Sequence, residues 1–234
     1  MKNKMINAVI IMNVITVFFM IGFLFVGFLG SITAKSVDVV PNLPAFGDVA
    51  GQKLGFGAIV QLEKSGSRFC SGVVIDRNYI LTAQHCIVVK GKPTSELIKV
   101  RKADGSYTGI VAKAVGVNNR VDIGLIQGDF SELERLDVDF YNFTAYGYHE
   151  KFQGYISCGF PYLQNHVSCT SFFPQTNWGF SIAGQGFAIP GMSGGPVIDL
   201  TTNKVIAINS AMLDGYYIVA PTLGTLGAFG IEPQ

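Results

Sequence analysis

The chain has 234 residues, enough for one large domain or for two small domains packed together. Hydrophobic residues make up 49% of it and charged residues 14%, and the net charge is +1, so neither a basic surface for nucleic acid nor an acidic tail is expected. Glycine is abundant, at 28 residues, and this mixture is typical of many short strands joined by turns.

The first segment, residues 1–35, predicts an N-terminal hydrophobic helix. Met5–Leu29 contains no charged residue, and Lys2 and Lys4 precede it. As a helix this run would exceed the roughly 30 Å hydrocarbon core of a bilayer. The length favours a signal anchor with its N-terminus in the cytoplasm, because a cleaved signal peptide has an apolar core of only about 7–15 residues. Cleavage after the small-residue site Ile32–Ala34 remains the alternative, and both predict that the rest of the chain lies outside the cytoplasm.

The four cysteines agree with an exported chain. Cys70, Cys86, Cys158 and Cys169 form no C-x-x-C pair, so no structural metal site is expected. Three disulfide pairings are possible, and we favour Cys70–Cys86 with Cys158–Cys169 because each is local in sequence. An oxidising compartment would allow both bridges to form.

The region after the apolar segment reads as a linker, residues 36–55, followed by a long domain, residues 56–234. Turn residues separate a first series of strand-like runs: Gly57–Glu63, Phe69–Ile75, Tyr79–Thr82, Leu97–Arg101, Tyr107–Val117 and Ile123–Gln127. A charged stretch, Asp129–Asp139, then predicts either a short helix or a strap between two halves. A second series follows: Gly154–Cys158, Val167–Phe173, Gly186–Ile189, Pro196–Asp199, Lys204–Asn209 and Tyr216–Ala220. About six strands on each side of the charged stretch predict an all-β protein.

The segment PGMSGGPVID, residues 190–199, places one serine, Ser193, among three glycines. A serine hydroxyl becomes a strong nucleophile only when a base removes its proton and a third group orients that base. All three histidines, His85, His149 and His166, precede Ser193. This order excludes the nucleophile elbow of α/β-hydrolases, in which the histidine follows the serine.

His85 has the most informative surroundings of the three histidines. Two strand-like runs joined by a tight turn lead from Phe69 to Cys86, with His85 as the penultimate residue. This block resembles the "FCGGSLI…WVLTAAHC" block of trypsin-like serine proteases, and the resemblance makes His85 the catalytic base. His149 and His166 lie among polar residues, and we expect both to be exposed and without a role.

The carboxylate of the triad is expected at Asp122, in a segment that resembles the "D-I-A-L-L" strand of the same family. His85 lies 37 positions before Asp122 (122 − 85), and Ser193 lies 71 positions after it (193 − 122). The resemblance implies a chymotrypsin-like fold of two six-stranded antiparallel β-barrels. The first barrel would cover about residues 56–128 and the second about residues 145–222.

In this family the amides of the serine and of the residue two before it form the oxyanion hole, which implies Gly191 and Ser193 here. Met192 stands where animal trypsins carry an aspartate that pairs with a newly cut N-terminus. We therefore expect no activation of that kind, because Met192 cannot accept an ammonium group.

The resemblance also suggests a primary specificity pocket, with Phe187, Ser210 and Met212 among its walls. Trypsin has an aspartate where Phe187 stands, and glutamyl endopeptidases have a histidine where Asn209 stands. Neither position offers a charge here, so an uncharged, apolar or small substrate side chain is expected, since burying an unpaired charge is costly.

These observations predict an exported or membrane-anchored serine endopeptidase that cleaves polypeptides through an acyl-enzyme, with no metal or other cofactor. Membrane contact would run through the N-terminal segment if that segment stays uncleaved. The alternative is a catalytically silent protease-like domain that acts as a binding module at the cell surface.

Overall fold

The computed structural model describes residues 55–118, 120–139, 154–186, 189–213, 215–222 and 229–230. The expected N-terminal hydrophobic helix lies outside these residues, as does all of the expected linker except its last residue, Gly55. Within the described part of the chain, none of the helices has the length and apolar character needed to span a bilayer.

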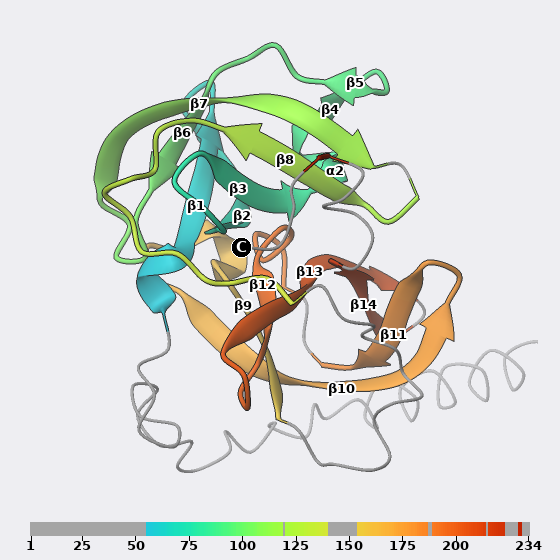
Figure 1. Ribbon diagram of the computed structural model, residues 1–234. Coiled ribbons are helices and arrows are strands. Elements are labelled where there is room, and N and C mark those ends of the chain that lie inside the picture. The colour runs from blue at the N-terminus through green and yellow to red at the C-terminus, as the bar shows by residue number, and fades with distance from the viewer. Residues whose placement is uncertain are drawn as a thin grey trace, which may run out of the picture. The chain divides into compact units, whose positions relative to one another are not determined.

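The first barrel closes through the strand order β1-β2-β3-β8-β7-β6, with every neighbouring pair antiparallel (Figure 1). Its strands are β1 (Ile59–Lys64), β2 (Ser67–Val74), β3 (Tyr79–Ala83), β6 (Ile98–Arg101), β7 (Tyr107–Asn118) and β8 (Ile123–Gln127). A two-stranded sheet, β4 (Val88–Val89) with β5 (Lys92–Pro93), extends from it. Bulges in three of the strand pairings bend the sheet, which helps it to close.

The second barrel closes through the order β10-β11-β14-β13-β12-β9, also antiparallel throughout. Its strands are β9 (Tyr155–Gly159), β10 (Ser168–Trp178), β11 (Ser181–Gln185), β12 (Pro196–Asp199), β13 (Lys204–Leu213) and β14 (Tyr216–Pro221). The two closed six-stranded barrels confirm the predicted all-β, chymotrypsin-like fold.

Each barrel is filled by the apolar residues of its strands, as the sequence pattern predicts. A cluster inside the second barrel consists of Tyr155, Phe172, Ile182, Val197, Ile206, Ala207, Tyr217 and Val219. Phe172 and Tyr217 meet edge to face, with ring centroids 5.4 Å apart. Such a pair adds to the hydrophobic stabilisation that burial of the two rings already supplies.

One expected strand lies elsewhere in the structure, and one alternative that the sequence left open is decided. The strand expected at Gly186–Ile189 lies earlier, as β11, because the Gly179–Phe180 turn closes a hairpin with β10. The charged stretch Asp129–Asp139 forms turns and extended chain without a helix, so it is a strap. Its end reaches the second barrel, where Val205 donates its backbone N–H to the carbonyl of Asp137 at 2.8 Å.

Three short helical turns complete the described chain: η1 (Phe56–Ala58), α2 (Gln84–Ile87) and η3 (Pro161–Leu163). The sequence shows no helical periodicity at these places, because four residues or fewer are too short to display one. The turn α2 directly follows β3 and carries His85.

Both disulfides favoured from the cysteine spacing are present. Cys70 on β2 is bonded to Cys86 on α2, and Cys158 on β9 is bonded to Cys169 on β10. The first bridge ties the turn that carries His85 to β2 of the first barrel. The second joins two neighbouring strands of the second barrel.

Removing the Cys70–Cys86 bridge is expected to destabilise the protein. The two cysteines are 16 positions apart, and a bridge that closes a loop of this length is worth about 3 kcal/mol in the chain-entropy model. Urea unfolding of a Cys70→Ala/Cys86→Ala double variant should show this loss as a lower midpoint. An unchanged midpoint and slope would contradict the expectation.

Candidate active site

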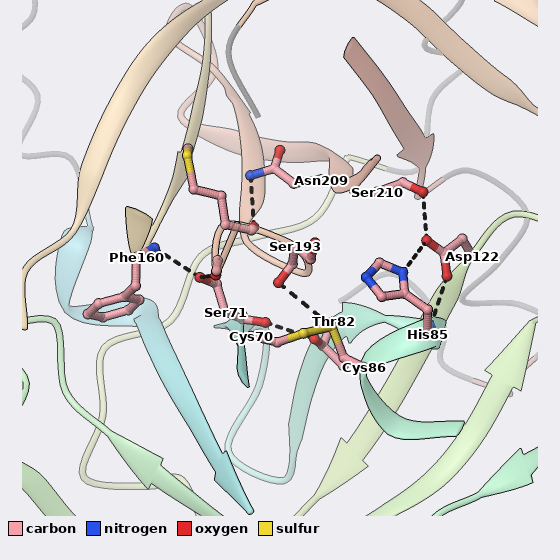
Figure 2. The surroundings of a disulfide bond; sticks show 12 residues. Cys70, Ser71, Thr82, His85, Cys86, Asp122, Phe160, Ser193, Asn209 and Ser210 are labelled. Carbon is pink, nitrogen blue, oxygen red and sulfur yellow. Dashed lines mark hydrogen bonds and ion pairs between the residues drawn. A yellow bond between two sulfur atoms is a disulfide. The ribbon is translucent and has the colours of Figure 1, made fainter. Parts of the chain in front are cut away.

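His85 and Asp122 meet at the end of the first barrel. The Nδ1 atom of His85 lies 2.8 Å from Oδ2 of Asp122, and the backbone N–H of His85 donates to Oδ1 at 3.0 Å (Figure 2). One carboxylate therefore orients both the ring and the backbone of the histidine. The imidazole remains about half exposed, with 49% of its side-chain surface accessible, so a substrate can reach it.

Asp122 stands directly before β8 in a left-handed conformation, with φ +44°. Aspartate adopts this region more readily than most residues do. The conformation is held by the Asp122 carbonyl, which accepts the N–H of Gln84 at 3.1 Å. The Asp122 carboxylate has a third donor besides the two from His85. The hydroxyl of Ser210, on β13 of the second barrel, donates to Oδ2 at 2.6 Å.

These contacts set the charge states of the pair. The hydrogen bond that the His85 ring donates to Asp122 raises the pKa of His85 above its ordinary value, against the opposing effect of burial. Burial alone would raise the pKa of Asp122, but the hydrogen bonds from His85 and Ser210 outweigh it and lower that pKa. Asp122 is therefore a carboxylate near neutral pH, and Nδ1 of His85 carries the proton that points to it.

Ser193 lies between β11 and β12, on the loop that faces the first barrel. Its carbonyl accepts the backbone N–H of Ser71 at 2.8 Å and lies 3.9 Å from Sγ of Cys86, the residue after His85. In Figure 2 the second ring nitrogen of His85 is turned toward Ser193. The described residues show no hydrogen bond between the two side chains, and in proteases without substrate this bond is often long.

Two of the glycines around Ser193 are required by their geometry. Gly191 has φ +99° and Gly194 has φ +85°, a region that other residues rarely adopt. A Cβ atom on Gly194 would collide with the Thr82 hydroxyl and with the Ser71 carbonyl. The loop can therefore approach the first barrel closely only with glycine at this position.

The amides of Gly191 and Ser193 are the two donors expected to form an oxyanion hole. In the part of the chain that the structure describes, neither N–H donates to another group. The neighbouring amides of Met192, Gly194 and Gly195 are all bonded within the protein. The two unpaired donors are thus available for a ligand atom.

Ser71 is a residue of this site that sequence reasoning missed. Its hydroxyl donates to the carbonyl of Gly191 at 2.7 Å and accepts the N–H of Phe160 at 3.0 Å (Figure 2). Ser71 is fully buried and joins β2 of the first barrel to the loop around Ser193. No local pattern indicates this link, because Ser71 and Gly191 are 120 positions apart.

The residues expected to line a specificity pocket are only partly described. Phe187 lies outside the described residues, Met212 is 47% exposed, and Ser210 is buried with its hydroxyl on Asp122. Of the other histidines, His166 is exposed and His149 lies outside the described residues.

Cys70, His85 and Cys86 lie close enough together to suggest a metal site. The two sulfur atoms form a disulfide, so they are not thiolates and cannot bind a metal as such. This cluster therefore lacks the donor set that a metal ion needs.

Comparison with known proteins agrees with this geometry. The family model of the trypsin-like peptidase domain matches residues 70–208. Lectizyme of Glossina austeni is 30% identical over 117 residues, a match that covers 42% of this chain and 42% of that protein.

Solved structures share the fold at low sequence identity. The serine endoprotease from Yersinia pestis has a TM-score of 0.57 and 18% identity, over 75% of this chain and 62% of that one. The inactive form of Rv3671c protease has a TM-score of 0.57 and 16% identity, over 76% of this chain and 91% of that one. The HtrA-type protease AlgW with decapeptide has a TM-score of 0.56 and 18% identity, over 72% of this chain and 62% of that one. With the family model matching more than half of its length, this chain belongs to the trypsin-like peptidase family.

Proposed function

We propose that the chain is a serine endopeptidase in which Ser193 is the nucleophile, His85 the general base and Asp122 the group that orients the base. The observation that carries the proposal is the arrangement around His85. One ring nitrogen is held by a carboxylate and the other faces a serine. On the loop of that serine lie two amides that donate to no group among the described residues.

The chemistry follows from these positions. His85 takes the proton of the Ser193 hydroxyl as its oxygen attacks the substrate carbonyl, and the positive imidazole that results is stabilised by Asp122. The negative oxygen of the tetrahedral intermediate accepts hydrogen bonds from the amides of Gly191 and Ser193. His85 then gives its proton to the leaving amine, and water releases the acyl group from Ser193 in a second round of the same steps.

The proposal is tested by labelling the folded protein with a fluorophosphonate probe and mapping the modified peptide. Labelling of Ser193 together with hydrolysis of a peptide library supports the endopeptidase. A folded protein that shows neither reaction would instead support the binding module, which keeps the fold without the chemistry.

We also propose that the peptidase domain, residues 56–234, functions outside the cytoplasm, behind a linker at residues 36–55. Two disulfides support this, because such bridges persist in oxidising compartments. Residues 1–35 would act as a signal anchor or as a cleaved signal peptide. Mass spectrometry of the mature N-terminus in membrane and secreted fractions distinguishes the two.

The substrate side chain before the cleaved bond is expected to be uncharged, and apolar or small. Asn209 cannot pair with an acidic side chain, because its carboxamide is buried and bonded to Ser157, Cys158 and Met192. Cleavage-site profiling on a peptide library measures the preference. A strong preference for Arg, Lys or Glu would contradict this expectation.

As the pH is lowered, activity should be lost with a midpoint above the ordinary pKa of histidine. His85 acts as a base only when it is neutral, and Asp122 raises its pKa, so protonation removes activity at a higher pH than for a free imidazole. The acid limb of kcat/KM against pH reports this pKa in the free enzyme. A midpoint at or below 6.5 would contradict the expectation.

A further inference from the structure

The directions of the two oxyanion amides depend on the groups that hold the carbonyl of the residue before each amide. The described residues contain no cis peptide bond, and in a trans peptide the N–H and the preceding C=O point to opposite sides. The amide of Gly191 is therefore aimed by the group that holds the carbonyl of Pro190. In the same way, the amide of Ser193 is aimed by whatever holds the carbonyl of Met192.

Within the described part of the chain, the Pro190 carbonyl is held only by backbone. It accepts the N–H of Tyr162 at 2.7 Å, from the turn η3. Tyr162 and Leu163 both have positive φ, at +49° and +58°, and a Cβ atom on Gly191 would collide with this turn. Since these contacts involve main-chain geometry, a side-chain substitution cannot remove them cleanly.

The Met192 carbonyl, by contrast, is held by a side chain as well as by the backbone. It accepts the backbone N–H of Gly195 at 3.0 Å and Nδ2 of Asn209 at 3.3 Å. The same Nδ2 donates to the carbonyl of Cys158 at 2.8 Å, so both amide hydrogens of Asn209 are used. Figure 2 shows this nitrogen directed at the backbone of the loop that carries Ser193.

Asn209 is itself fixed by a buried chain of hydroxyl groups. Its Oδ1 accepts the hydroxyl of Ser157 at 3.0 Å, and the Ser157 oxygen lies 2.5 Å from the hydroxyl of Tyr217. Because Ser157 donates to Asn209, Tyr217 must donate to Ser157. Ser157 and Tyr217 are fully buried and Asn209 is 1% exposed, so water does not compete for these bonds.

The backbone of Asn209 adds two further bonds to the same loop. Its N–H donates to the carbonyl of Gly195 at 2.9 Å, and its carbonyl accepts the N–H of Gly194 at 2.8 Å. One residue of β13 therefore contacts the loop on both sides of Ser193. All of these groups are uncharged, and Met192 is 1% exposed without any carboxylate to pair with a cation.

We propose that Asn209 is a positioning residue: its carboxamide, oriented by Ser157 and Tyr217, holds the Met192 carbonyl so that the Ser193 amide faces the oxyanion. The inference rests on the proposed endopeptidase function. In this proposal, a buried chain of uncharged hydrogen-bonding groups orders the oxyanion loop. The ordering needs neither a charge at Met192 nor a cut N-terminus.

The test compares Asn209→Leu and Tyr217→Phe with the wild-type protein in kcat, KM and affinity for a peptide boronic acid. The boronic acid forms a tetrahedral adduct on Ser193 that places an oxygen at the oxyanion position. Thr222→Val is the matched control. Thr222 directly follows β14 and is 1% exposed, and its hydroxyl bonds to the carbonyls of Ile206 and Asp139, away from the loop.

Asn209→Leu is expected to lower kcat at least about tenfold. Complete loss of one oxyanion donor lowers kcat by about 10²–10³-fold, and a Ser193 amide that points in the wrong direction should cause part of that loss. KM should change little, since substrate in the ground state does not need this donor. Affinity for the boronic acid should fall in parallel with kcat. Tyr217→Phe should show a smaller loss of the same kind, and Thr222→Val should keep the wild-type kcat even if it lowers stability.

A wild-type kcat in Asn209→Leu, or a loss seen only in KM, would overturn the positioning role while leaving the proposed function intact. If Asn209→Leu does not fold, Tyr217→Phe decides, and an unchanged kcat and boronic acid affinity in that variant overturn the role. A wild-type protein that neither cleaves peptides nor binds the boronic acid would overturn the proposed function itself.

Discussion

Replacing Ser193 with alanine is expected to reduce kcat for peptide hydrolysis by on the order of 10⁶-fold, the loss typical when a serine protease loses its nucleophile. The fold should survive, because the Ser193 hydroxyl makes no hydrogen bond among the described residues. Ser193 contacts the first barrel through its carbonyl, which alanine keeps. Single-turnover and steady-state assays of the purified variant measure the loss.

A matched control is Ser67→Ala, which removes the hydroxyl of an exposed serine at the start of β2. This variant should hydrolyse peptides as the wild-type protein does. Near-ultraviolet circular dichroism of both variants should match the wild-type spectrum. If Ser193→Ala retained wild-type turnover, Ser193 would not be the nucleophile.

Replacing Asp122 with asparagine should lower kcat by about 10⁴-fold, as expected when a Ser-His-Asp triad loses its carboxylate. A carboxamide can turn its N–H toward Nδ1 of His85, which leaves the proton on the other ring nitrogen. That tautomer cannot accept the proton of Ser193. The pKa of His85 should also fall toward its ordinary value, because the hydrogen bond to Asp122 is the largest cause of its increase.

Ser210→Ala provides the comparison for Asp122→Asn. It removes one donor to the carboxylate but leaves the contact between Asp122 and His85 in place. Its loss of kcat should therefore be much smaller. An NMR titration of the His85 ring in each variant separates the effect on pKa from the effect on rate. If Asp122→Asn lost no more activity than Ser210→Ala, the orienting role of Asp122 would be wrong.

The features that the sequence determined by itself are those encoded in short segments. Alternating apolar residues between turn residues predicted twelve strands and an all-β fold, because a strand records its buried face in its own residues. The block that ends at His85, the segment around Asp122 and the glycines beside Ser193 are also local. The residues of each segment therefore suffice to assign it a role by resemblance.

The remaining features depend on contacts between segments far apart in the chain, and only the tertiary structure decided them. The strand expected at Gly186–Ile189 lies at β11, because pairing with β10 and β14 selects the register and the local residues do not. Ser71 reaches Gly191 across 120 positions, and Ser157 reaches Asn209 across 52. The residues next to a buried serine or asparagine do not indicate its hydrogen-bond partner, because the bond forms only when folding brings the two groups together.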